Sequence, residues 1–235
     1  MKPQLFLSSI TSAPRLLALS AALGGAALLV ACGGGGDDNT PQPPKPNPVT
    51  VAPTLDCSAA GKAASNASTA ASTVCMLTSD GEIVVELDAR APITVDNFQQ
   101  YVTAKYYDNT IFHRVVPGFV AQGGGFTTGL VQKTAGQRAA IKLESGIAGL
   151  SNTKYTIAMA RATGADTATS EFYFNSVDNS AILDKTSSSA GYAVFGRVIS
   201  GQATIDKINA EPSQQWMSID TPRTEVLLYW AIRLK

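Results

Sequence analysis

The chain has few of the residues from which metal and redox sites are built. Its 235 residues include one histidine and three cysteines, too few for a zinc site of three or four nitrogen and sulfur ligands. We expect no metal and no cofactor. Charged residues are also scarce, at 15% against about 25% in a typical soluble domain. Because 18 basic residues balance 18 acidic ones, no basic face indicates a nucleic-acid partner.

Residues 1–31 have the pattern of a removable secretion signal. Lys2 and Arg15 carry the only charges, and the apolar run over 16–31 is shorter than the about 20 residues of a membrane span. Leu29-Val30-Ala31-Cys32 resembles the lipobox of bacterial lipoproteins, which implies cleavage before Cys32 and lipidation of that cysteine. The alternative is an ordinary secretory signal followed by an unrelated cysteine.

A lipid at Cys32 predicts a membrane-anchored protein of the bacterial cell envelope that faces the periplasm. Gly33 follows the cysteine where an aspartate would, in the sorting rule of enteric bacteria, favour the inner membrane, so the outer membrane is slightly favoured. Residues 32–53 are a linker rich in glycine and proline. Such a segment cannot bury enough apolar surface to offset its ordering entropy, so we expect an extended tether.

Residues 54–75 form an extension rich in alanine and serine that contains two cysteines, Cys57 and Cys75. In an oxidising compartment the two most simply form a disulfide. A loop of that size would gain about 3 kcal/mol from the cross-link. The alternative is a pair of free buried thiols.

The pattern changes to short β-strands from Val74 onward. The strand-like runs alternate apolar and polar residues or are rich in β-branched residues, and they cover 81–87, 110–116, 118–122, 155–160, 171–174, 191–199 and 225–234. Two helices interrupt them, one over about 95–104 with Thr94 as its cap and one over 202–209. Seven or eight strands with two helices favour a closed antiparallel barrel or a sandwich over alternating βαβ units.

The densest chemical signature runs from Phe112 through His113, Arg114 and Pro117-Gly118 to Gly124. This segment resembles the signature of the cyclophilin-type peptidyl-prolyl cis-trans isomerases, and the resemblance continues in order and spacing over 158–161, 168–175, 178–184 and 191–198. It covers about 76–235, the proposed isomerase domain. The family fold that it implies is mainly β, a closed eight-stranded antiparallel β-barrel capped by two α-helices.

By this resemblance the catalytic residue is Arg114. Alternation along 110–116 places Phe112, Arg114 and Val116 on one strand face, where water would compete poorly for the charge. Taken alone, an arginine on a strand is more often a solvated surface residue. The single histidine, His113, matches a buried structural position on the opposite face, and no nucleophile accompanies it.

The remaining site residues follow from the same resemblance. Phe119, Val120, Tyr173 and Leu183 match an apolar cup for the proline ring, although each taken singly is more often a core residue. Gln122 matches a residue that hydrogen-bonds the substrate backbone and supports the arginine. The substrate-binding set is completed by Ala160, Arg161, Glu171 and Tyr192.

Four of these residues depart from the common pattern. Val120 replaces methionine, Tyr173 replaces phenylalanine, Tyr192 replaces a histidine, and Glu171 replaces glutamine. An anion close to Arg114 either orients its donors or withdraws them from the substrate. Two functions therefore remain, both for a monomer that takes proline-containing polypeptides: an isomerase acting on X–Pro bonds of unfolded or newly exported envelope proteins, and a non-catalytic proline-binding or holdase module.

Overall fold

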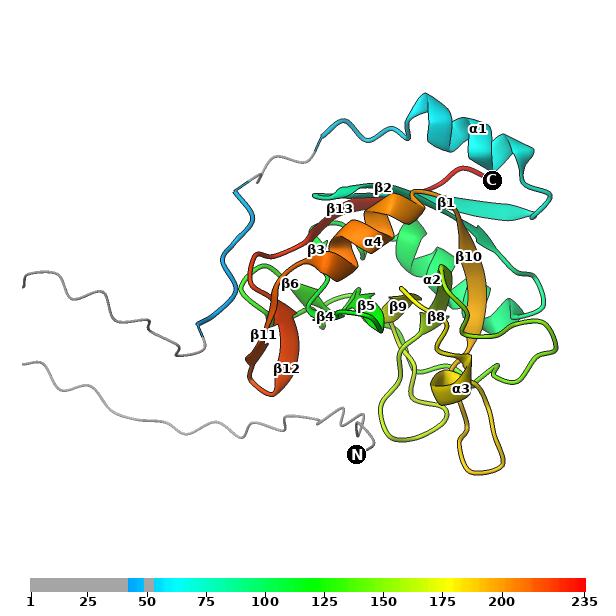
Figure 1. Cartoon of the computed structure of the whole chain (residues 1–235). Helices are drawn as coiled ribbons and strands as arrows, with labels where there is room; N and C mark the ends of the chain where they lie inside the picture. The colour runs from blue at the N-terminus through cyan, green and yellow to red at the C-terminus, as the bar shows by residue number, and fades with distance from the viewer. Residues whose placement is uncertain (1–41, 49–52) are drawn as a thin grey trace, which may run out of the picture.

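The computed structural model describes residues 42–48 and 53–235. The expected signal peptide and Cys32 lie outside the described residues. Eleven strands form one curled antiparallel sheet in the order β4-β5-β9-β8-β10-β2-β1-β13-β3-β6-β7, and a separate hairpin pairs β11 with β12 (Figure 1). The strands are β1 Ser72–Thr78, β2 Gly81–Leu87, β3 Thr110–Ile111, β4 Arg114–Val116, β5 Val120–Gly123, β6 Phe126–Thr127, β7 Val131–Gln132, β8 Thr156–Met159, β9 Phe172–Asn175, β10 Val194–Ser200, β11 Ser213–Trp216, β12 Ile219–Pro222 and β13 Leu227–Arg233.

The fold is mainly β, as predicted, but the prediction of a closed barrel of eight strands is wrong. The strand order ends at β4 and at β7, and these two strands are not paired with each other. The expected strand over 110–116 is divided, because β3 pairs with β13 whereas β4 pairs with β5. Between them the Phe112 N–H donates to the Val226 carbonyl at 2.9 Å. The chain thus changes partner strands at 112–113, and the sheet curls without closing.

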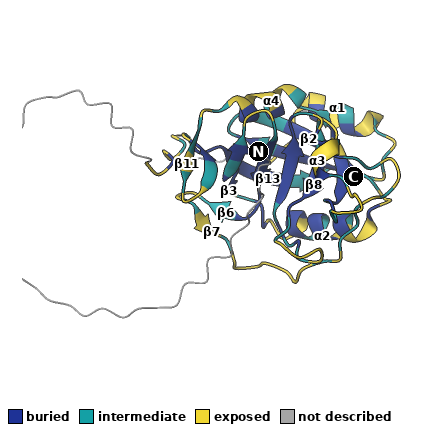
Figure 2. Ribbon diagram, turned by 60° about the horizontal axis from the view of Figure 1, so that its bottom comes forward, coloured by how far each residue is buried: buried dark blue, intermediate teal, exposed yellow. Residues whose placement is uncertain are grey.

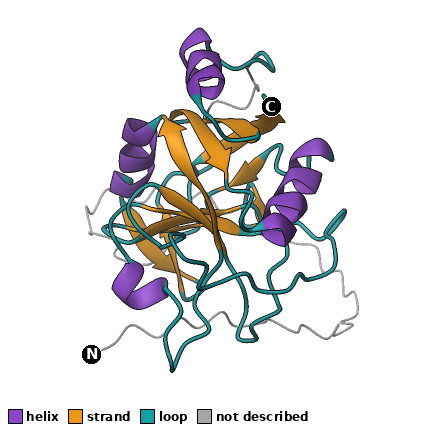
Figure 3. Cartoon of the chain, turned by 90° about the vertical axis from the view of Figure 1, so that its right-hand side faces the viewer, coloured by secondary structure: helices purple, strands orange, loops and turns teal. Residues whose placement is uncertain are grey.

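Helices lie around the sheet rather than inside it (Figure 3). They are α1 Ala59–Ala67, α2 Pro92–Thr103, α3 Ser180–Leu183 and α4 Gln202–Ala210. No helix among residues 42–48 and 53–235 combines the length and the apolar character that crossing a bilayer requires. The strands are mostly buried and the outward faces of the helices are exposed (Figure 2).

Helix α2 begins earlier than the sequence predicts, and Thr94 does not cap it. Ala91 is the residue before the first turn and makes no side-chain capping bond. Instead the carboxylate of Glu144, from a distant loop, accepts from the N–H of Ile93 at 3.1 Å and from the N–H of Thr94 at 2.7 Å. A remote carboxylate therefore serves the unpaired N–H groups of the first turn. The expected inward residue Phe98 is fully buried.

Helix α4 lies where it was predicted, and it holds the turn between β4 and β5 in place. Ile205 and Ile208 are fully buried. Its last turn places Asn209 against the turn between β4 and β5, where the side chain accepts from the Gly118 N–H at 2.8 Å and donates to the Val116 carbonyl at 2.9 Å. Two bonds from one side chain hold this turn at a fixed position.

The alanine-rich extension is folded onto the sheet. Ser58 begins α1, its hydroxyl accepting from the Gly61 N–H at 3.0 Å. The structure joins Cys57 to Cys75 by a disulfide, and Cys75 lies in β1, which sits between β2 and β13 in the sheet. The sheet therefore takes in the end of the extension, since it begins at Ser72 rather than after Cys75.

Part of the expected free tether is also docked. Residues 42–48 run beside the β11–β12 hairpin (Figure 1), and Lys45 forms a parallel bridge with Thr224. An extended spacer was expected over the whole of 32–53. Backbone hydrogen bonds to 223–225 hold this short portion instead.

Candidate active site

The candidate site lies on one face of the β4-β5-β9 end of the sheet. Arg114 in β4 stands directly opposite Gln122 in β5, and Gln122 stands opposite Tyr173 in β9. Residues opposite one another in an antiparallel sheet point to the same side. The pairing therefore places a cation, an amide and an aromatic ring in one row.

The opposite face of the same strands is core. Val115 and Ala121 belong to the main hydrophobic cluster, and so does Phe112. The prediction that Phe112 shares a face with Arg114 is wrong, because Phe112 precedes β4 and the alternation does not extend through 112–113. Val115 alone marks the buried side of β4.

Eight of the predicted residues line one pocket. Apolar side chains supply most of the wall, and a guanidinium and an amide supply its polar groups; the residues are Arg114, Phe119, Val120, Gln122, Ala160, Tyr173, Leu183 and Tyr192. Such a cup, with an apolar wall and few convergent polar groups, has the lining typical of a small-ligand site.

Arg114 is half-buried, and one of its Nη nitrogens is buried without a hydrogen-bond partner among the described residues. Burial lowers the pKa of its guanidinium, while the negative charge of Asp220 and the ring of Tyr192 raise it. An arginine stays charged under these conditions. Arg114 thus lines the apolar cup and carries a buried donor that no described residue uses.

The remaining two predicted residues lie beside the cup rather than in its wall. The guanidinium of Arg161 stacks over the Tyr192 ring at 4.6 Å, and its Nε donates to the Gly191 carbonyl at 3.0 Å. Arg161 thus supports the ring that forms part of the wall.

Glu171 is bound to Gln122 and His113, and no hydrogen bond or ion pair joins it to Arg114 among the described residues. Its Oε2 accepts from the Gln122 side-chain amide at 2.8 Å and lies 3.3 Å from Nε2 of His113. Burial raises the pKa of the Glu171 carboxyl, but His113 and the Gln122 amide more than offset this and hold it below its ordinary value. His113 is buried, as expected. The Glu171 carboxylate is therefore held by Gln122 and His113 and is not paired with Arg114.

Gly125 provides the room for this carboxylate. A Cβ on Gly125 would stand 2.5 Å from Oε1 of Glu171. Any larger residue at 125 would force the carboxylate to move and would disturb its contacts with Gln122 and His113. The glycine and the glutamate therefore act as a pair.

A buried polar network that the sequence did not reveal supports the far wall. The Tyr173 hydroxyl donates to Oδ1 of Asn152 at 2.8 Å, and both the backbone and the side chain of Asn152 donate to Asp184, each at 2.8 Å. This network satisfies the additional hydroxyl that Tyr173 brings into the cup. Leu183-Asp184 is part of the family signature, but Asn152 lies in a loop without any motif.

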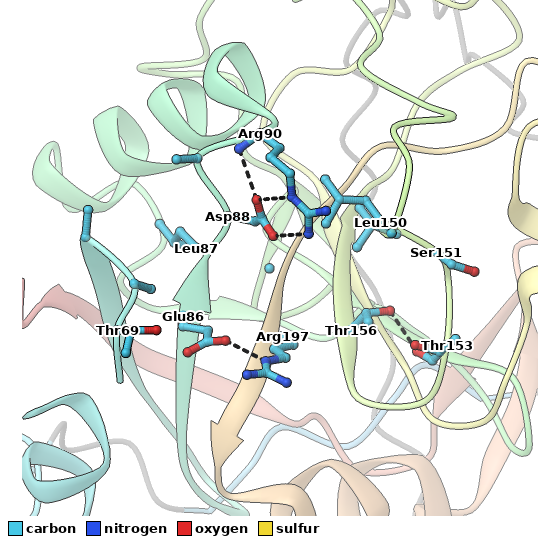
Figure 4. Close-up of a pocket in the computed structure, with 16 residues that line it drawn as sticks. Thr69, Glu86, Leu87, Asp88, Arg90, Leu150, Ser151, Thr153, Thr156 and Arg197 are labelled. Carbon is cyan, nitrogen blue, oxygen red and sulfur yellow. Dashed lines mark hydrogen bonds and ion pairs between the residues drawn. The ribbon is translucent and has the colours of Figure 1, made fainter. Parts of the chain in front are cut away.

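A larger cavity, of about 740 Å³, lies away from this row of residues (Figure 4). Its charged groups are already paired: Nε of Arg197 lies 2.5 Å from Glu86, and Nη2 of Arg90 lies 2.6 Å from Asp88. None of the predicted site residues lines it. Since acids and bases neutralise one another there, it offers no comparable reactive group.

Comparison with known proteins agrees with the geometry. The family model described as "Cyclophilin type peptidyl-prolyl cis-trans isomerase/CLD" matches residues 73–228. The peptidyl-prolyl cis-trans isomerase of Acinetobacter baylyi is 45% identical over 153 residues, covering 64% of this chain and 79% of that protein. Peptidyl-prolyl cis-trans isomerase B of Escherichia coli is 41% identical over 156 residues, covering 64% and 93%.

The fold also matches a solved structure. A cyclophilin-type isomerase from Cryptosporidium parvum superposes with a TM-score of 0.57 at 24% identity, covering 69% of this chain and 96% of that one. The protein belongs to the cyclophilin-type peptidyl-prolyl cis-trans isomerase family and catalyses cis-trans isomerisation of peptidyl-prolyl bonds.

Proposed function

We propose that Arg114 is the catalytic residue and that the apolar cup beside it holds the proline ring of an extended polypeptide. The observation that carries this proposal is the buried, unpartnered Nη nitrogen of Arg114 in the wall of the cup. A related structure was determined in the presence of the dipeptide Ala-Pro, which supports a proline-containing peptide as the occupant.

The reaction needs no proton transfer and no nucleophile. Resonance between the prolyl nitrogen and the preceding carbonyl creates a rotational barrier of about 18–20 kcal/mol. At the twisted geometry the nitrogen lone pair is free to accept a hydrogen bond. A guanidinium N–H aimed at that lone pair therefore binds the transition state more strongly than either planar isomer.

The energies required are of the right order. Shortening an event of about 100 s to about 1 ms needs about 7 kcal/mol, at 1.36 kcal/mol for each tenfold step. A single preorganised donor in a poorly hydrated site supplies about 2.7–4 kcal/mol. Orientation of the bound ring in the cup formed by Phe119, Tyr173 and Leu183 supplies the remainder.

A protease-coupled assay on an Ala-Pro peptide tests the assignment. Arg114→Ala should lower kcat/KM by about 100-fold to 1,000-fold, the range found when a preorganised donor is deleted, and Arg114→Lys should restore little because lysine lacks the planar fork. Arg197→Ala is the matched control, since Arg197 pairs with Glu86 in the other cavity. Full activity of Arg114→Ala would refute the assignment, and peptide binding without acceleration by the wild type would favour the holdase alternative.

We further propose that the clients are unfolded or newly exported envelope polypeptides and that the protein is a monomer held at the membrane by a lipid on Cys32. The lipobox-like sequence at 29–32 and the apolar run before it support this location. Cys32→Ser should move the protein from the membrane fraction to the soluble fraction and abolish incorporation of labelled palmitate. Unchanged membrane association would refute the lipid anchor.

A further inference from the structure

The docked segment 42–48 makes a specific set of contacts. The Lys45 N–H donates to the Arg223 carbonyl at 2.8 Å, and the Glu225 N–H donates to the Lys45 carbonyl at 2.9 Å. The Asn47 side chain donates to the Glu225 carbonyl at 3.1 Å. This is strand addition to the segment just before β13, of the kind by which extended peptides bind sheet edges.

The side chains at this contact are also specific. Pro44 is buried although its neighbours Pro43 and Lys45 are exposed. The Glu225 side chain is buried, and its carboxylate accepts from the Gly129 N–H at 2.6 Å. The segment therefore rests on a residue that is itself tied to the β6–β7 loop.

The same contact supports the β11–β12 hairpin. The Arg223 N–H donates to the Pro212 carbonyl at 2.7 Å and closes the base of this hairpin, while its carbonyl binds the segment. At the other end of the segment, the Gln214 side chain donates to the Gln42 carbonyl. Gln42 at one end of the segment is thus bound to the hairpin, and Lys45 is bound to its base.

The hairpin needs such support. A two-stranded hairpin is marginally stable by itself, and its tip places Met217 and Ser218 at φ values of 50° and 65°, a region that disfavours residues with a side chain. Its strand β12 packs against β4, the strand that carries Arg114. Asp220 lies in β12, where its carboxylate accepts from the Gln215 side chain, and its negative charge raises the pKa of Arg114.

We propose that residues 42–48 are a positioning strap, which keeps the β11–β12 hairpin packed against β4 and so keeps the charge of Asp220 in place near Arg114. This inference rests on the proposed role of Arg114. In this proposal the strap binds no substrate. The edge of 223–225 is already occupied by residues 42–48 of the same chain. Its loss should disturb the direction of the guanidinium and leave the apolar cup intact.

The test uses the full chain with two strap variants. Lys45→Pro removes the N–H that binds Arg223, and Lys45→Ala is its matched control because it keeps that N–H. Pro44→Asp places a charge in the buried proline position. Lys45→Pro and Pro44→Asp should speed amide hydrogen exchange across β11 and β12 by at least about tenfold and lower kcat about threefold to tenfold with KM unchanged, whereas Lys45→Ala should match the wild type.

A double mutant tests whether the strap affects kcat through Asp220. Asp220→Asn should lower kcat in the same way, and adding Pro44→Asp to it should cause no further loss, because interacting sites are not additive. Unchanged hairpin exchange in both strap variants, or faster exchange with unchanged kcat, would overturn the strap. Arg114→Ala is measured in parallel. If this variant kept full activity, the role of Arg114 would be overturned as well. If it lost activity while the strap variants kept theirs, the strap alone would be overturned.

Discussion

Glu171 is the residue whose effect on catalysis is hardest to judge from its type alone. Its carboxylate is bound by the Gln122 amide and lies beside His113, and no hydrogen bond or ion pair joins it to Arg114 among the described residues. Binding the Gln122 amide group turns the Gln122 carbonyl oxygen to the other side. Glu171 is therefore a support for Gln122 rather than a counterion of the arginine.

This arrangement predicts a small effect of Glu171→Gln on the reaction. The new side chain keeps an oxygen that accepts from Gln122, so kcat/KM should change by less than about threefold, whereas Glu171→Ala leaves a buried amide unpaired at a cost of about 1–3 kcal/mol. The measurement is the same Ala-Pro assay with both variants. A tenfold rise in activity of Glu171→Gln would contradict the geometry and show that the carboxylate restrains Arg114.

For the individual residues, the sequence predicted which side chains form the site better than it predicted their contacts. The apolar cup and Arg114 are recognisable because each stands in a motif of fixed spacing. The partner of Glu171 was not predictable, because it depends on the space left by Gly125 and on the position of His113 across two strands. The same holds for Asn152, whose loop brings it to Tyr173 from 21 residues away.

Among the elements, those with a clear apolar period were predicted and those held by distant contacts were not. Helix α4 has its two isoleucines at helical spacing, and β2 has a β-branched run, Ile83-Val84-Val85, within Gly81–Leu87. Helix α1 is made of small and polar residues, so its place depends on the disulfide and on Glu82, which accepts from the Ser58 N–H at 2.7 Å. The β11–β12 hairpin has polar strands and no glycine at its tip, and therefore gave no turn signal.

The Cys57–Cys75 disulfide should stabilise the protein without affecting the reaction. The two cysteines are 18 positions apart, and closing a loop of about that length is worth about 3 kcal/mol. Replacing both by serine should lower the free energy of unfolding by that amount in urea titrations and speed amide exchange in α1. The kcat/KM should stay within about twofold, because Cys75 and the cup belong to separate hydrophobic clusters. A large loss of activity at unchanged stability would contradict this assignment.

For the whole molecule, the charges balance and stability against acid depends on individual carboxyl groups. Glu171 has a lowered pKa, so its contribution is present above its ordinary value of 4.5 and is lost as pH falls through the folded value. Glu225 has a pKa raised by burial, only partly offset by its hydrogen bonds. Its effect has the opposite sign: the stabilisation is full below its ordinary value and is lost as pH rises through the folded one.

Isosteric variants can separate the opposite pH dependences of the stability contributed by Glu171 and by Glu225. Glu171→Gln should be less stable than the wild type at pH 7, and the difference should shrink as pH falls below 4.5, because the carboxyl of the unfolded wild type takes up its proton before that of the folded protein. Glu225→Gln keeps an oxygen for the Gly129 N–H and removes a buried charge, so it should equal or exceed the wild type at pH 7, by no more than about 1 kcal/mol.

Urea midpoints measured from pH 7 to pH 3 give both differences. The Glu225 gain should vanish toward acid pH, because the wild-type carboxyl is then neutral as well. Asp178→Asn is the comparison for an exposed carboxyl: hydrogen bonds from Ser180 lower the pKa of Asp178, so its difference from the wild type should also shrink toward acid pH. If both glutamate variants kept a constant difference from the wild type over this range, their carboxyl groups would titrate alike in the folded and unfolded chains, and the electrostatic roles assigned to them would be wrong.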